Sequence, residues 1–143
     1  ISLKVLLSLI IIQIVFGAFV SGLDAGMIYQ TWPKMNTSFI PDDIILKKIN
    51  LDYFNNQSFV QFIHRLTAYL ITVFVIVTGF IYLYKKKIKL LKNYFFVLIV
   101  LITQIILGII TLISGLNLLI ASLHQITSVI LVFTILNLNH KFS

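Results

Sequence analysis

Four long apolar stretches, separated by polar segments, occupy most of this chain. They cover residues 5–22, 59–84, 94–115 and 118–138, are rich in Leu, Ile, Val and Phe, and contain no proline. A helix rises about 1.5 Å per residue and a bilayer core is roughly 30 Å thick, so each stretch is long enough to cross a membrane. The pattern predicts an all-α integral membrane protein, a four-transmembrane-helix bundle.

Composition agrees with this prediction. Of the 143 residues, 59% are hydrophobic and 10% are charged, and the mean hydropathy is +1.06, far from the values of soluble domains. We expect a single membrane domain over residues 1–143, surrounded by lipid. The first apolar stretch has no small-residue cleavage site after it, and the chain begins with Ile1 rather than Met. We therefore expect it to be part of a longer polypeptide and not to start with a signal peptide.

Charge predicts the orientation. Five lysines crowd the link at residues 85–93, between the second and third helices, and short positively charged links stay in the cytoplasm. Both ends of the chain are then cytoplasmic, and the long loop at residues 23–58, which holds all four acidic residues, lies outside. The net charge of +7 is thus a topology signal, and we expect no nucleic-acid partner.

The chain also repeats itself. The segment QIVFG at residues 13–17 returns as QIILG at 104–108, and HRLTA at 64–68 is paralleled by HQITS at 124–128. The chain therefore reads as two copies of a helical hairpin, and both copies start on the cytoplasmic side. This is a parallel repeat, whose two-fold axis lies along the membrane normal and brings equivalent residues to face each other.

Those equivalent residues include two histidines, His64 and His124. Each lies roughly 9 Å below the outer start of its helix, and an ionisable ring at that depth marks a functional site by default. The chain has no Cys and no Glu, which removes thiolate ligands and leaves zinc without its usual third or fourth ligand. Two axial imidazoles suit haem b in a helical bundle. In the alternative, each histidine only bonds a polar side chain on a neighbouring helix.

Other polar positions have more than one interpretation. Arg65 is expected to pair with a haem propionate or to reach the headgroups, and Gln125 to bond the cofactor or another helix. Gln13 and Gln104 are expected to bond between helices, and the small-residue faces that include glycines at 17 and 108 to allow close helix packing.

At this point the sequence resembles a known family, the haem A synthases, and specifically their C-terminal four-helix half. The resemblance covers almost the whole chain, although Gln30, Lys34 and Asn36-Thr37 depart from the residues usual in the family. It rests on the strings GAFVSGLDAG at 17–26, YQTWPKM at 29–35, VQFIHR at 60–65, QIILGIITL at 104–112 and LHQ at 123–125.

The resemblance implies an oxidoreductase of the bacterial inner membrane that oxidises a methyl group of haem o to the formyl group of haem a, for cytochrome c oxidase biogenesis. It implies that haem b binds in this half, with its iron between residues matching His64 and His124. The substrate site and a catalytic carboxylate would lie in the N-terminal half, so we expect no catalytic residue here. Expected partners are that N-terminal half, haem o, haem O synthase and a second copy of the protein.

Two other functions fit the same residues. One is a b-type cytochrome, an electron-transfer membrane subunit with bis-histidine haem and no oxidation chemistry of its own. The other is half of a transporter, which the repeat and the glycines suggest but which predicts broken helices and polar residues near the bilayer midplane.

Overall fold

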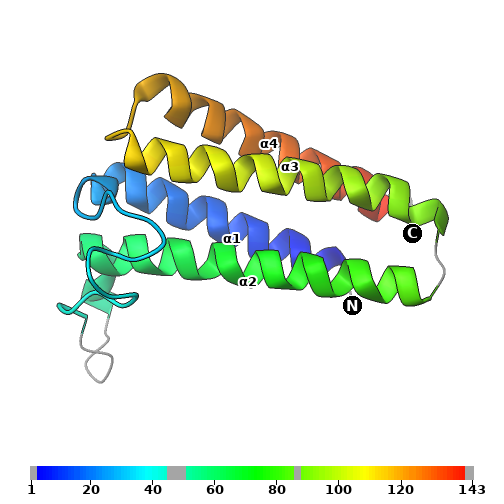
Figure 1. The fold of residues 1–143 in the computed structure, drawn as a ribbon, viewed down its shortest axis with the longest axis horizontal. Helices are drawn as coiled ribbons and strands as arrows, with labels where there is room; N and C mark the ends of the chain where they lie inside the picture. The colour runs from blue at the N-terminus through cyan, green and yellow to red at the C-terminus, as the bar shows by residue number, and fades with distance from the viewer. Residues whose placement is uncertain (1–2, 45–50, 86–87, 141–143) are drawn as a thin grey trace.

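The computed structural model describes residues 3–44, 51–85 and 88–140, and four long helices dominate it (Figure 1). Each of the four is long and apolar enough to cross a membrane, and the described residues form no regular strand. The predicted all-α membrane bundle is therefore confirmed. The helices are α1 (Leu3–Gly22), α2 (Gln57–Tyr84), α3 (Ile88–Ile113) and α4 (Leu118–His140), with short 3-10 turns η1 (Ala25–Met27) and η3 (Leu51–Asn55) between the first two.

The two hairpins pack into one bundle. Helix α1 packs along α2 and α3 along α4, and the hairpins meet through contacts of α1 with α4 and of α2 with α3. Helices α2 and α4 therefore lie on one diagonal of the bundle. We call the end that holds the loop after α1 the loop end, and the opposite end, where α2 is linked to α3, the link end (Figure 1).

Side-chain caps fix where the helices begin at the loop end. The Asn56 side chain accepts a hydrogen bond from the backbone N–H of Phe59 at 2.8 Å, so α2 begins two residues before the apolar stretch that predicted it. The Asn117 side chain caps α4 in the same way, by accepting from the N–H of Leu119 at 3.1 Å. Helix α3 also begins earlier than residue 94, because lysine is a good helix former and the helix continues beyond its apolar part.

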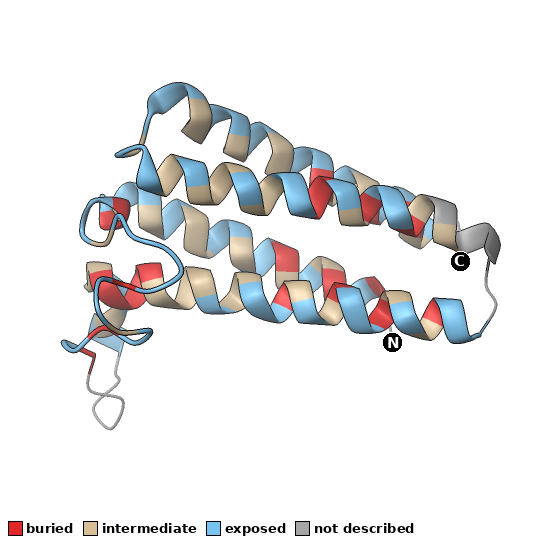
Figure 2. Cartoon of the chain, in the orientation of Figure 1, coloured by how far each residue is buried: buried red, intermediate tan, exposed pale blue. Residues whose placement is uncertain are grey.

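The two ends of the bundle are packed very differently. In Figure 2 the buried residues of α1, α3 and α4 gather in the half near the link end, whereas toward the loop end these helices are half-buried or exposed and the ribbons diverge. The bundle thus has a tight core at one end and a loosely packed half at the other. That core contains Leu3, Leu6, Ile10, Ile71, Val75, Tyr82, Tyr94, Val97, Val100, Leu101, Leu131, Ile135 and Leu138.

A pair of tyrosines joins the hairpins within this core. The ring of Tyr94 on α3 stands edge-on to that of Tyr82 on α2, with centroids 5.2 Å apart. Its hydroxyl donates a hydrogen bond of 2.5 Å to the backbone carbonyl of Val75. Gly79 leaves room for the ring, since a Cβ there would lie 3.1 Å from Tyr94 Cε1.

We expect Tyr94→Phe to lower the free energy of unfolding by about 1 kcal/mol, the usual contribution of one hydrogen bond. The measurement is denaturant unfolding in detergent micelles. Tyr84→Phe is the matched control, because Tyr84 is 89% exposed at the end of α2 and its replacement should leave stability unchanged. Equal effects of the two substitutions would contradict the role given to the Tyr94 hydroxyl.

Candidate functional site

His124 is held against the helix that precedes it in the chain. Its Nδ1 lies 3.1 Å from the backbone carbonyl of Gln104 on α3. A carbonyl only accepts hydrogen bonds, so Nδ1 carries the proton and Nε2 carries the lone pair. A backbone carbonyl commonly fixes a metal-ligating histidine in this way. The Gln104 amide nitrogen lies 3.4 Å from that Nε2, where it can donate to the lone pair.

Gly108 makes this approach to the helix backbone possible. A Cβ at this position would lie 2.9 Å from His124 Cε1, a distance at which one of the two groups must move. The ring therefore occupies the space where other residues carry a side chain. Gly108 follows Gln104 by one helical turn, so both residues contact the same imidazole. We call this pair an imidazole seat: the ring packs on the glycine, and the glutamine lies beside it.

The first hairpin builds the same seat from equivalent residues. Gln13 on α1 donates to the backbone carbonyl of His64 at 3.0 Å, and its amide nitrogen lies 3.4 Å from His64 Nε2. A Cβ at Gly17 would lie 3.3 Å from His64 Cε1. The predicted interhelical bonds of the two glutamines are confirmed, and so is close packing at both glycines. Both contacts are made to the histidines, as the alternative in which each histidine bonds a polar side chain on a neighbouring helix expects. The identity of the two glutamines was not singled out for this, and the shared Gln-to-Gly spacing was the available signal.

The two rings come from helices that do not belong to the same hairpin. They are on α2 and α4, which lie on one diagonal of the bundle. Both residues are half-buried, and both lie in the loosely packed half of the bundle. Side chains with small or hydroxyl groups, Thr67 and Thr127, follow each histidine by three residues on the same helix face.

These features fit a flat metal complex held between the imidazoles. His64 Nδ1 and Gln104 Oε1 are buried without a hydrogen-bond partner, which is costly in the apolar interior and indicates that the site is not self-contained. No group of three or more His, Cys, Asp or Glu occurs among residues 3–44, 51–85 and 88–140. A metal at this site would therefore have only the two histidines as ligands from the described residues, which suits the axial positions of a haem.

Arg65 contacts the loop, a role that was not predicted for it. Its guanidinium donates to backbone carbonyls of the loop: Nη1 to Thr31 at 2.9 Å and Lys34 at 3.3 Å, and Nη2 to Tyr29 at 2.9 Å. The structure does not test an additional contact to a cofactor. Arg65 thus fastens the loop to α2 directly beside His64.

Two glutamines on the same face of α2 extend this attachment. Gln61 donates to the carbonyl of Tyr29 at 3.0 Å, and Gln57 to that of Leu23 at 2.5 Å. Together with Arg65 they form a ladder of donors spaced four residues apart, which we call the loop clasp. The spacing at one face of a helix was visible in the sequence, but the backbone acceptors could not be identified from it. Gln125, the repeat equivalent of Arg65, is exposed, and its bond to a cofactor or to another helix stays a prediction.

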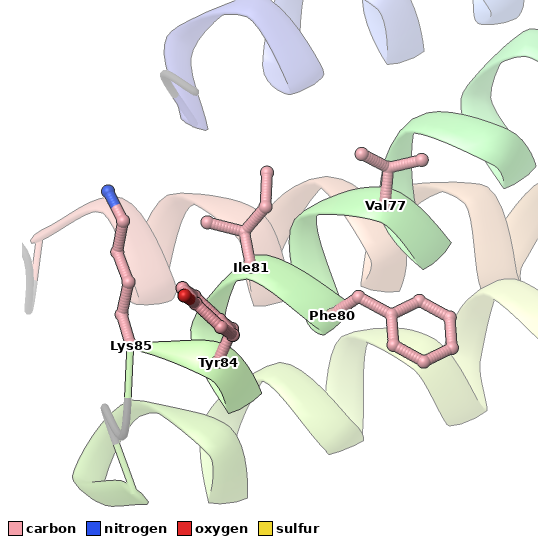
Figure 3. A pocket seen from close by; sticks show the side chains of 5 residues that line it. All are labelled: Val77, Phe80, Ile81, Tyr84 and Lys85. Carbon is pink, nitrogen blue, oxygen red and sulfur yellow. The ribbon is translucent and has the colours of Figure 1, made fainter.

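A shallow hollow elsewhere on the surface takes no part in the site. Figure 3 shows its lining, which comes from the last turns of α2 and the residue after them, at the link end and away from the histidines. An apolar surface bordered by a tyrosine and a lysine is typical of a helix end at a membrane interface. The hollow is lined by Val77, Phe80, Ile81, Tyr84 and Lys85.

Comparison with known proteins gives a consistent result. A sequence model of a family described as cytochrome oxidase assembly protein matches residues 1–136. Proteins named heme A synthase are similar to this chain: that of Pelagibacter ubique (strain HTCC1062) is 50% identical over 126 residues, 87% of this chain and 37% of the relative. That of Wolbachia pipientis wMel is 43% identical over 128 residues, 89% of this chain and 35% of the relative.

A third relative, the heme A synthase of Rickettsia felis (strain ATCC VR-1525 / URRWXCal2), is 41% identical over 130 residues, 91% of this chain and 39% of the relative. The chain thus spans little more than a third of the length of these relatives. No solved structure matches it.

The contact between each glycine and its histidine ring can be tested by substitution. We expect Gly108→Ala to displace the His124 ring and break its bond to the Gln104 carbonyl, and Gly17→Ala to disturb His64 less, because the contact there is longer. The measurement is the 15N chemical shift of the histidine ring nitrogens in the purified chain. Gly22→Ala is the control, since a Cβ there meets nothing within 4 Å. Unchanged ring shifts in Gly108→Ala would contradict the seat.

The loop clasp predicts a local effect on the loop. We expect Arg65→Met to raise amide hydrogen exchange at residues 29–36 by at least roughly tenfold, because three charge-assisted bonds to the loop are lost. Arg65→Lys should restore little of this protection, since an ammonium group has no planar fork. Lys85→Met, at the link end, serves as the control for loss of a positive charge. Loop protection that survives Arg65→Met would show that the clasp is not what holds the loop.

Proposed function

The chain belongs to the cytochrome oxidase assembly protein family, and from this premise we propose that it is the C-terminal, haem-binding part of a haem A synthase. The whole protein would oxidise a methyl group of haem o to the formyl group of haem a, as the names of the relatives suggest. The role of this chain would be to bind a haem b whose iron is ligated by His64 and His124.

One observation carries this proposal. Two equivalent imidazoles, each fitted against a glycine of the preceding helix, come from diagonal helices into the loosely packed half of the bundle. At His124 the Gln104 carbonyl holds the proton on Nδ1 and leaves the lone pair on Nε2, which would have to exchange its 3.4 Å contact with the Gln104 amide for the iron. A haem b bound between two histidines would supply an electron-transfer centre with no open coordination position. The residues of the chain bind and orient it, and the surrounding apolar helices exclude water.

Acid–base chemistry would lie outside this chain. The sequence has no Glu, and its four Asp residues, at 24, 42, 43 and 52, are all in the loop region rather than in the four long helices. We propose that the catalytic carboxylate and the substrate site are in the remaining part of the polypeptide, which would contact this bundle. Haem O synthase, as the source of the substrate, and a second copy of the protein are further proposed partners.

The charge distribution supports a location and an orientation. We propose a multi-pass protein of the bacterial inner membrane with the link end, rich in lysine, in the cytoplasm. The loop end and both imidazole seats would then face the outer side. Tyr84 and Lys85 end α2 at the link end, where such residues anchor helices at the membrane surface.

The second candidate, a b-type electron-transfer subunit, is favoured by the same pair of imidazoles and by the lack of a carboxylate in the helices. Conversion of haem o by the full-length protein separates the two functions: a haem A synthase forms haem a, whereas the cytochrome subunit only changes its redox state. The transporter alternative has less support, because α1 to α4 run without interruption over their described lengths.

The ligand assignment predicts the behaviour of three histidine variants. His64→Ala and His124→Ala should each abolish the low-spin haem spectrum and lower haem content severalfold, because each removes one axial ligand. His140→Ala is the matched control, since His140 is exposed at the end of α4, and it should retain the wild-type spectrum. The measurement is the reduced-minus-oxidised spectrum of the purified protein, with extraction to identify the haem. A wild-type spectrum in both of the first two variants would refute the assignment.

A further inference from the structure

The two imidazole seats share their sequence pattern but not their hydrogen bonds. In the second hairpin the His124 ring is bonded through Nδ1 to the backbone of Gln104. The Gln104 amide nitrogen lies 3.4 Å from the ring, the same distance as that of Gln13 in the first hairpin, but the buried Oε1 of Gln104 has no partner to fix the side chain. His124 is therefore positioned by the α3 backbone.

In the first hairpin the situation is reversed. His64 Nδ1 is buried and makes no hydrogen bond of standard geometry, although the backbone carbonyl of Gln13 does interact with the ring. The side chain of Gln13 makes the contacts instead. Its amide nitrogen donates to the His64 carbonyl at 3.0 Å and approaches the ring Nε2, and its Oε1 accepts a bond from the Thr67 hydroxyl.

The equivalent threonine of the second hairpin makes no such link. Thr127 donates within its own helix, to the carbonyls of Leu123 at 2.5 Å and His124 at 3.2 Å. Thr67 lies equally close to its own intrahelical carbonyls, but its single hydroxyl proton can also be given to Gln13 Oε1, an acceptor that Thr127 does not have. The bond to Gln13 connects α1 to α2 at the level of His64, whereas Gln104 Oε1 makes no corresponding bond to α4.

We propose that Gln13 is the positioning residue of His64, locked in place by Thr67, and that Gln104 has no comparable role for His124. The two histidines would then be held by different parts of a repeated motif, one by a side chain and one by the backbone. A substitution of the glutamine side chain can remove the first hold but not the second. For its effect on the bound cofactor, this inference rests on the proposed function.

Matched substitutions in the two hairpins test the inference. Leucine has nearly the volume of glutamine and no hydrogen-bonding group, and it suits a membrane helix. In the full chain reconstituted in nanodiscs, before haem is added, we expect Gln13→Leu to shift the ring 15N resonances of His64 and leave those of His124 in place. Gln104→Leu should keep the Nδ1–H form of His124. After haem addition, Gln13→Leu should lose haem roughly tenfold faster than the wild type, and Gln104→Leu within about twofold of it.

Substitutions of the two threonines provide a second set of variants, which change fewer atoms than the glutamine substitutions. Thr67→Val should move the His64 ring resonances in the direction of Gln13→Leu, Thr67→Ser should keep them at the wild-type position because it retains the hydroxyl, and Thr127→Val should be silent at His124. If Gln13→Leu does not fold, this set decides the question alone.

Some outcomes would overturn the inference. These are equal shifts from the two glutamine substitutions, a larger effect from Gln104→Leu, or identical spectra for Thr67→Val and Thr67→Ser. The nitrogen shifts are measured without haem, so they decide the inference even if His64→Ala and His124→Ala retain the haem spectrum. That spectral result would refute the proposed function alone.

Discussion

The site depends on the need of a buried imidazole for a hydrogen-bond partner inside an apolar bundle. Neither histidine can find that partner on its own helix, whose backbone groups are already paired, so each ring reaches for the preceding helix. A glycine there removes the side chain that would block the approach, and a glutamine one turn earlier supplies polar atoms. Close contact within each hairpin is therefore set by the ring, at Gly17 and Gly108.

These polar contacts of the two rings at the loop end go together with uneven apolar packing along the bundle. At the link end, Leu, Ile, Val and two tyrosines form a continuous core that fixes the spacing of all four helices. At the loop end a comparable core would fill the volume between His64 and His124. Around the histidines the structure uses hydrogen bonds, in the two seats and in the loop clasp of Gln57, Gln61 and Arg65. A smaller apolar cluster around Phe59 and Val60 packs the start of α2 against the loop. Polar contacts thus order the half of the bundle in which apolar packing is weak.

Much of this could be predicted from the sequence, because its strongest signals are long-range and additive. Apolar stretches of membrane length fixed the number of helices, and the repeat indicated that Gln13 and Gln104, and the two histidines, occupy equivalent places. The observed helix starts differ from the predicted ones, because single capping side chains such as Asn56 determine where a helix begins. The partners of Arg65 could not be foreseen, since they are backbone carbonyls of a loop whose path no pattern records. The ligand assignment itself stays a prediction.

The divergence between the hairpins follows from that loop. The repeat aligns the clasp residues Gln57, Gln61 and Arg65 with Asn117, Ala121 and Gln125. The second hairpin has only a tight turn, with left-handed backbone at Gly115 and Leu116, and it has nothing for a clasp to hold. In the first, Arg65 ties the turn of α2 around His64 to the loop. In the same hairpin His64 Nδ1 makes no hydrogen bond of standard geometry, and the Gln13 side chain contacts both the His64 carbonyl and Thr67. The two hairpins, although similar in sequence, thus hold their histidines differently, and only the first of them carries the long loop.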